Sequence, residues 1–354
     1  MTGRLAGFGL PELFAGIIVA ALNVYVLTGG ADFGGGVWDL FASGPRRDAQ
    51  RRLIAQTIGP IWEANHVWLV LVVVLTFTTF PAVFATLGTV LHIPLALMLV
   101  GIVLRGTAFV FRGYGSRTLE QRRHWGRLFA MASTFTPLLL GIAIGAVASG
   151  AAGAAGAVSA ASAAPAPDST TTFLAVYVAP WWSPFPVAVG ILALTLFAMV
   201  AAVYLAYETH DEGLREDFRW RALAASAAVF VAAFGALIAA HFDAPLMRAG
   251  LVGSAWALPF QLVTGAAAIT AIGALWRRRY AIARLAAAAQ LSLILWGWAL
   301  AQFPYVVPPQ LTIRNSVAPR ITLVIVAWAL AAGAVLLIPS LLYLRRTFET
   351  KRSR

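Results

Sequence analysis

The feature that most constrains this chain is a series of nine apolar segments, each long enough to cross a bilayer as a helix. The hydrocarbon core is about 30 Å thick, so a spanning helix needs roughly 20 mainly apolar residues. The nine segments lie near residues 10–28, 61–80, 87–111, 128–149, 185–207, 222–241, 257–276, 285–302 and 321–344. They predict an all-α integral membrane protein with about nine transmembrane helices.

The composition excludes soluble classes of protein. Hydrophobic residues make up 60% of the 354 residues and charged residues only 11%, and the mean hydropathy is +0.80. A soluble globule of this composition would expose most of its apolar surface. The net charge of +12 therefore indicates neither a soluble enzyme nor a nucleic-acid-binding domain, and we expect no nucleic-acid partner.

The basic residues predict the orientation of the helices. Twenty-one of the 26 basic residues lie in alternate connections and in the C-terminal tail, which are residues 42–60, 112–127, 208–221, 277–284 and 345–354. Positively charged loops stay in the cytoplasm. The pattern places the N-terminus outside and the C-terminus in the cytoplasm, and nine spans satisfy every loop, whereas eight or ten would break the alternation. Of the other five, only Arg105 lies inside an apolar segment.

The stretch 150–172 is rich in Gly, Ala, Ser and Thr and lacks charge over most of its length. Such a composition is typical of a flexible linker. We therefore predict an N-terminal four-helix half over 1–149, a low-complexity extracytoplasmic linker over 150–184, and a C-terminal five-helix half with a cytoplasmic tail over 185–354.

A glycine-rich stretch, Thr28–Gly36, carries a single carboxylate, Asp32, where the first apolar segment ends. Polar residues at membrane depth are costly, so each is a functional candidate. Glycines such as Gly34 and Gly36 allow a close backbone approach or a sharp re-entry of the chain. The alternative is a glycine-rich helix terminus with Asp32 as its cap.

A second polar cluster, Gly59–Trp68, stands at the start of the second apolar segment. Glu63 and His66 are three residues apart and share a helix face. The predicted orientation places them in the cytoplasmic half of the membrane, where a carboxylate and an imidazole can pass protons. The alternative is a helix cap with interfacial aromatic residues. The residues that would fix this helix start are Trp62, Asn65 and Trp68.

Arg105 lies about 9 Å from the inner end of the third segment, at a depth similar to that of Glu63. The short turn around Pro81 predicts that the second and third segments form a helical hairpin. A Glu63–Arg105 pair is therefore the leading partner assignment. Alternatively, Arg105 snorkels to the cytoplasmic surface without a partner.

The chain has no cysteine, and its five histidines remain as possible ligands for a metal or haem. His66 and His92 lie at opposite depths and cannot hold one haem between them. His124 and His210 lie in arginine-rich loops. His92 and His241 both fall near the outer surface, but no surrounding pattern supports a site. We predict no metal and no haem on this chain.

The sequence resembles subunit II of the cytochrome bd-type quinol oxidases. The matching segments follow the order found in that family and are Thr28–Gly36, Thr57–Trp68, Leu104–Arg105, Tyr204–Tyr207 with the charged loop after it, and Gln302–Thr312.

The resemblance implies a bacterial, multi-pass subunit of the cytoplasmic (inner) membrane, acting in a complex that oxidises quinol and reduces dioxygen to water. It implies a partner, subunit I, that carries two haem b and one haem d, and a small single-helix accessory subunit as a further candidate partner. It also implies two four-helix bundles plus one peripheral helix for this chain, with lipid around it. Some relatives carry a structural quinone, so one is possible here, but no residue predicts where it binds.

The resemblance assigns Glu63 to a cytoplasmic proton path, with His66 and Asp32 as aids. Two positions depart from the family pattern. Glu63 replaces the more usual Asp, which keeps the acid and lengthens its reach by one methylene. Gly29 replaces the first of two acids that the glycine-rich motif often contains, which leaves Asp32 alone.

Two other functions share these sequence features. A proton-coupled membrane transporter also combines interrupted helices with buried ionisable residues. A free-standing membrane cytochrome b would bind haem on this chain itself.

Overall fold

The structure is a computed structural model that describes residues 9–58, 62–115, 118–161 and 169–352. Within these ranges, only the backbone is described at residues 58, 62–64, 114–115, 119, 160–161, 169–172, 337–338 and 341–352. The described chain is almost entirely helical, which confirms the all-α prediction.

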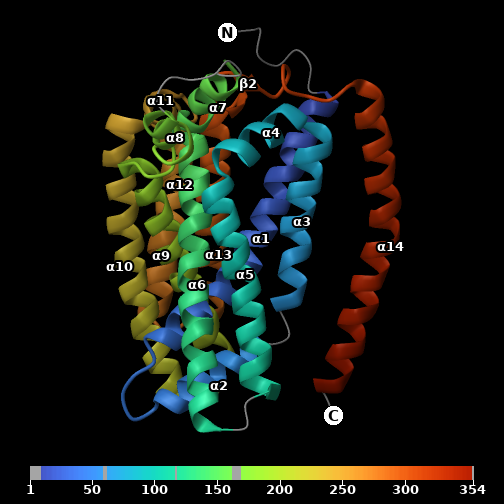
Figure 1. Cartoon of the computed structure of the whole chain (residues 1–354). Helices are drawn as coiled ribbons and strands as arrows, with labels where there is room; N and C mark the ends of the chain where they lie inside the picture. The colour runs from blue at the N-terminus through green and yellow to red at the C-terminus, as the bar shows by residue number, and fades with distance from the viewer. Residues whose placement is uncertain (1–8, 59–61, 116–117, 162–168, 353–354) are drawn as a thin grey trace.

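The helices and strands follow one another in a single series (Figure 1). They are α1 (Leu10–Leu40), α2 (Arg47–Ile58), α3 (Trp62–Thr79), α4 (Pro81–Val90), α5 (His92–Val110), the π-helical turn η1 (Phe111–Gly115), α6 (Leu119–Ala148), α7 (Ala151–Ala161), α8 (Ser169–Tyr177), α9 (Pro184–Glu208), α10 (Glu212–Asp243), α11 (Pro245–Gly253), α12 (Ala257–Trp276), α13 (Tyr280–Gln302), β1 (Tyr305–Val307), β2 (Leu311–Thr312) and α14 (Arg320–Arg352).

Seven helices of the described chain are long and apolar enough to cross a membrane, namely α1, α5, α6, α9, α10, α12 and α13. The bent pair α3 and α4 raises this count to eight if it forms one span. In α14, the part Arg320–Leu336 is a shorter apolar helix. The chain is therefore a multi-pass membrane protein, and the count of nine spans stays a prediction.

The long helices pack around α9. This helix makes its main contacts with α1, α6, α10 and α13, while α3 packs mainly on α1 and α5 mainly on α6. Figure 1 shows α14 standing apart from the other helices along most of its length. Its first turns reach the cluster around Phe14, Leu75 and Phe80, where Leu323 is buried.

The connection between α3 and α5 differs from the predicted hairpin. Proline cannot continue a hydrogen-bonded helix, and α4 begins at Pro81 at an angle of 117° to α3. Helix α4 crosses the end of the molecule at which α1 begins (Figure 1). As a result α3 and α5 are joined through α4 and pack on different helices.

The segment 150–184 also differs from the predicted flexible linker, because it contains α7 and α8. Alanine is the best helix former, and α7 is rich in it. Ala152 and Ala155 are buried with Val90 and Leu91 of the α4–α5 junction. The small side chains that suggested a linker instead allow α7 to lie close against α4. The division of the chain into two halves stays a prediction.

Candidate functional site

The site is built on the middle of α1. The stretch Thr28–Gly36 is helical throughout and lies within α1, so Asp32 neither caps a helix end nor marks a re-entry of the chain. Its glycines serve close approach between helices. A Cβ atom on Gly34 would lie 2.0 Å from the carbonyl oxygen of Phe197, and one on Gly36 would lie 2.2 Å from the side chain of Ser133.

This close packing brings charged side chains together in the interior. Asp32 forms an ion pair with Arg105 of α5, and each residue is only 1% exposed. The Nδ2 of Asn65 on α3 donates a hydrogen bond of 3.0 Å to Asp32 Oδ2. The Nε of Arg105 donates one of 3.0 Å to Ser133 Oγ on α6. Four helices therefore meet at one buried ion pair.

Aromatic rings close the cluster around the guanidinium. Arg105 Cζ lies 4.6 Å from the ring centroid of Phe33 and 5.1 Å from that of Phe129. Such contacts stabilise a desolvated cation. The unpartnered, snorkelling Arg105 is thus wrong, since the side chain is enclosed and paired.

The partner that the structure shows for Arg105 is Asp32, a pairing that the sequence does not predict. A hairpin of the second and third segments favours Glu63, but the bend at Pro81 removes that hairpin, and α1 supplies Asp32 instead. The side chain of Glu63 lies outside the described part of the chain, so a Glu63–Arg105 contact stays a prediction.

A second ion pair lies seven residues further along both helices. Arg112, in η1 just after α5, donates to Asp39 of α1 at 3.0 and 3.2 Å, and Asp39 is 1% exposed. Arg51 of α2 lies 3.7 Å from the same carboxylate. Burial lowers the pKa of Arg51, and Asp39 opposes this effect.

The sequence reasoning missed Asp39 and Arg112. The available signal was the shared spacing, because Asp32 and Asp39 on α1 are as far apart as Arg105 and Arg112 are. Seven residues are two helical turns, about 10.5 Å of rise. The two pairs therefore form a ladder. It runs into the interior from the arginine-rich end of the molecule, which is the end that holds α2, η1 and the connection between α12 and α13.

The other predicted residues flank this ladder. His66 on α3 is partly buried and interacts electrostatically with Asp32 and Arg105. Trp68 packs against the main hydrophobic core. The side chain of Trp62, like that of Glu63, lies outside the described part. The structure thus brings Asn65, Asp32 and Arg105 together and places His66 near them.

The ladder can hold fixed charges and orient polar groups. In the interior, the attraction between opposite charges is strong, and each pair holds a carboxylate and a guanidinium in a defined place. Within the described ranges, no group of three or more His, Cys, Asp or Glu side chains gathers in a way that could hold a metal ion. His92 contacts the carbonyl oxygen of Thr89 and the edge of the Tyr177 ring.

The model of one protein family, cytochrome bd terminal oxidase subunit II, matches residues 10–348. The chain belongs to this family. As a subunit II of cytochrome bd oxidase, it is a component of an oxidoreductase complex and works with a subunit I. The resemblance found in the sequence is thereby confirmed.

Curated members of the family are similar to this subunit II. Cytochrome bd-I ubiquinol oxidase subunit 2 of Escherichia coli (strain K12) is 23% identical, and the match covers 92% of this chain and 90% of that protein. Cytochrome bd ubiquinol oxidase subunit 2 of Bacillus subtilis (strain 168) is 33% identical over 135 residues, which are 38% of this chain and 39% of that protein.

A solved structure shares the fold of this subunit II. A chain of the bd oxidase from Geobacillus thermodenitrificans superposes with a TM-score of 0.74 at 22% sequence identity. The match covers 96% of this chain and 98% of that one, so the likeness extends over the whole helical arrangement.

Proposed function

We propose that this chain is the haem-free subunit II of a quinol:oxygen oxidoreductase that reduces dioxygen to water. Its role is to support the haem-bearing subunit I and to provide a path for protons from the cytoplasm. The observation that carries the proposal is the buried ladder of Asp39–Arg112 and Asp32–Arg105, which leads inward from the arginine-rich end.

The arrangement of the helices supports this role. We infer an N-terminus outside, a cytoplasmic C-terminus, nine spans in two four-helix bundles, and α14 as the peripheral helix. The cytoplasmic (inner) membrane of a bacterium is the location that this topology and the family suit. In that orientation α2, with its four arginines in and just before it, lies at the cytoplasmic surface, and Asp39 is the first buried acid beyond it.

Glu63 is the proposed proton carrier. It lies in the first turn of α3, two residues before Asn65, which is bonded to Asp32. His66 follows on the next turn and completes the polar face. Asp32 aids the path as a fixed anion, because Arg105 and Asn65 hold its oxygens; it orients Asn65 and sets the field near Glu63 and His66. Trp62 and Trp68 fix the start of α3.

The redox groups belong to the partner in this proposal. Subunit I would hold two haem b and one haem d and would contact quinol and dioxygen. A small single-helix subunit and a structural quinone are further candidate components, and membrane lipid surrounds the whole. The histidines of this chain lie on α3, α5, α6 and α10 and in the connection between α9 and α10.

Haem content tests the division of labour. The chain expressed alone should show no haem absorbance, while the complex with its partner should show three haems. Haem bound in stoichiometric amount to the isolated chain would overturn the proposal and favour a free-standing cytochrome b. Proton-coupled solute transport by the isolated chain would favour the transporter.

Glu63→Gln tests the proton path. The amide keeps the size of the side chain but cannot carry a proton, so quinol oxidase turnover should fall at least tenfold. The haem spectra should stay unchanged. Glu63→Asp is the matched control, which keeps the acid and should keep most of the activity. Full activity of Glu63→Gln would remove Glu63 from the path.

A further inference from the structure

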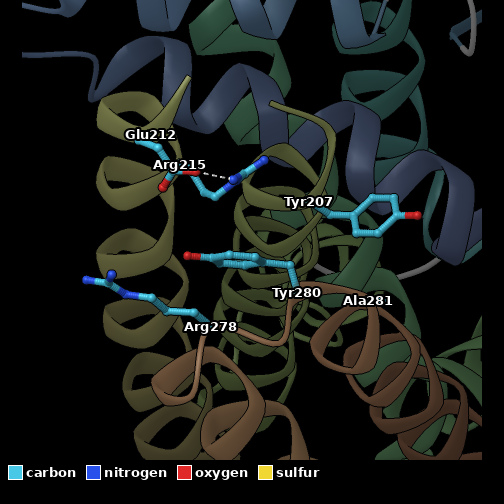
Figure 2. Close-up of a pocket in the computed structure, with 6 residues that line it drawn as sticks. All are labelled: Tyr207, Glu212, Arg215, Arg278, Tyr280 and Ala281. Atoms are coloured by element: carbon cyan, nitrogen blue, oxygen red, sulfur yellow. Dashed lines mark hydrogen bonds and ion pairs between the residues drawn. The ribbon is translucent and has the colours of Figure 1, made fainter. Parts of the chain in front are cut away.

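A groove lies at the arginine-rich end of the molecule, between the end of α9 and the starts of α10 and α13 (Figure 2). Its volume is about 450 Å³, and it is lined by Tyr207, Glu212, Arg215, Arg278, Tyr280 and Ala281. We propose that this groove binds the phosphate headgroup of an anionic lipid. The proposal is independent of the proton path.

Two arginines supply donors to the groove. Arg278 has a side chain that is 66% exposed, and its only carboxylate contact among the described residues is a distant one, 3.6 Å from Glu216. Arg215 pairs with Glu212 and donates to the carbonyl oxygen of Thr209, but its Nε is buried and has no hydrogen-bond partner in the described part of the chain. The side chain of Arg215 as a whole is 22% exposed and lines the groove, so its guanidinium can still donate to a phosphate oxygen there.

The backbone holds Arg278 in an unusual conformation. Helix α12 ends in a Schellman motif, in which Arg278 N donates to Leu275 O and Arg279 N donates to Ala274 O. The position of Arg278 in this motif requires a left-handed backbone and usually carries glycine; here φ is +58°. A long cationic side chain at a position that favours glycine is consistent with a binding role.

Tyr280 completes the groove. Figure 2 shows its ring lying between the side chains of Arg215 and Arg278, and Arg215 Cζ is 5.5 Å from the ring centroid. The phenol can donate a hydrogen bond to a phosphate oxygen. Tyr207, which also lines the groove, has the Cζ atom of Arg284 over its ring, 4.0 Å from the ring centroid. Three arginines, Arg215, Arg219 and Arg278, face two glutamates here, so the local charge is positive.

Two tryptophans place the groove at the level of lipid headgroups. Trp220 and Trp276 pack edge to face with ring centroids 6.1 Å apart, and they are 54% and 65% exposed. Exposed tryptophans mark the boundary between headgroups and acyl chains. Trp276 is two residues before Arg278, and Trp220 is five residues after Arg215, about 8 Å deeper by helical rise. A lipid phosphate therefore lies at the right height, with its acyl chains along α10 and α12.

The test uses the purified two-subunit complex and native mass spectrometry. The delipidated complex is titrated with dioleoylphosphatidylglycerol, with dioleoylphosphatidylcholine, and with inorganic phosphate as a competitor. The variant is Arg278→Gly, which removes the cation and suits the left-handed backbone, so the fold should persist. Arg52→Ala on α2 is the matched control, because it removes one exposed arginine of the same end outside the groove.

We expect wild type and Arg52→Ala to retain one phosphatidylglycerol in preference to phosphatidylcholine, and Arg278→Gly to bind it about tenfold more weakly, the effect of one charge-assisted hydrogen bond. Tyr280→Phe should weaken it severalfold, and this variant decides the question if Arg278→Gly fails to assemble. Equal retention by variant and control overturns the site. Displacement of the lipid by millimolar inorganic phosphate would assign the groove to a soluble anion and overturn the lipid proposal.

Discussion

Asp32 and Arg105 lie 73 positions apart in the chain and form an ion pair in which neither side chain is more than 2% exposed. The pair joins α1 to α5, which do not follow each other directly. Asn65 of α3 and Ser133 of α6 hydrogen-bond to it from two further helices. This ion pair thus joins four helices, and it contacts the stretch of α3 at which the proposed proton path starts, because Asn65 is only two residues after Glu63.

Breaking this pair should destabilise the complex. Removing one partner of a buried ion pair leaves an uncompensated charge and costs about 3–5 kcal/mol. Asp32→Asn and Arg105→Met should each lower the unfolding temperature of the purified complex sharply. The double variant Asp32→Asn with Arg105→Met should be more stable than the sum of the single effects, because no lone charge remains. Additive losses would show that the two residues do not interact.

Gly34 should tolerate no side chain. A Cβ at this position would lie 2.0 Å from the carbonyl oxygen of Phe197 and 2.7 Å from Ala201, so α1 and α9 would have to separate. Gly34→Ala should cost about 3 kcal/mol or more. Gly16→Ala on the same helix is the control, since a Cβ there meets nothing within 4 Å. We expect it to be neutral or slightly stabilising by thermal unfolding. Equal effects would contradict the packing.

The buried ion pair of Asp39 and Arg112 should stabilise the fold more than the exposed pair of Arg46 and Asp217 does. Asp39 is buried and faces Arg112 and Arg51, whereas Arg46 is 52% exposed and pairs with Asp217 at the surface. Exposed pairs contribute little because water and salt screen them. Asp39→Asn should therefore lower the unfolding temperature far more than Arg46→Ala does. The effect of Arg46→Ala should also shrink further in high salt, and the reverse order would argue against the ladder.

The sequence predicts the charged residues of the site better than their partners. Asp32 and Arg105 stand out because one charge lies at the end of an apolar segment and the other lies inside one, and a charge at membrane depth is costly. Their pairing depends on which helices touch, and the bend at Pro81 changes that in a way that no periodicity reveals. From the sequence alone, the glycines of α1 suggest a break in the helix. The structure shows that they allow close contacts with α9 and α6 instead.

The burial of Asp39 and the helix around Gly153 could not be predicted from the sequence for a similar reason. Asp39 sits at the predicted edge of a loop, where a carboxylate next to arginines looks solvated, and its burial follows from α2 and η1 folding over it. The segment around Gly153 looks like a linker by composition. In the structure it is a helix, and its glycine is explained by a close contact, since a Cβ on Gly153 would lie 2.0 Å from the carbonyl oxygen of Pro308. Tertiary contacts decide such cases.

We propose that protons for oxygen reduction enter through this chain. The direct measurement is the uptake of protons and the build-up of membrane potential in liposomes that contain the oriented complex, after a pulse of quinol and oxygen. With Glu63→Gln, we predict that proton uptake from the cytoplasmic side slows at least tenfold together with the potential, while Glu63→Asp stays close to wild type. Unchanged uptake in Glu63→Gln, with intact haem spectra, would contradict the account.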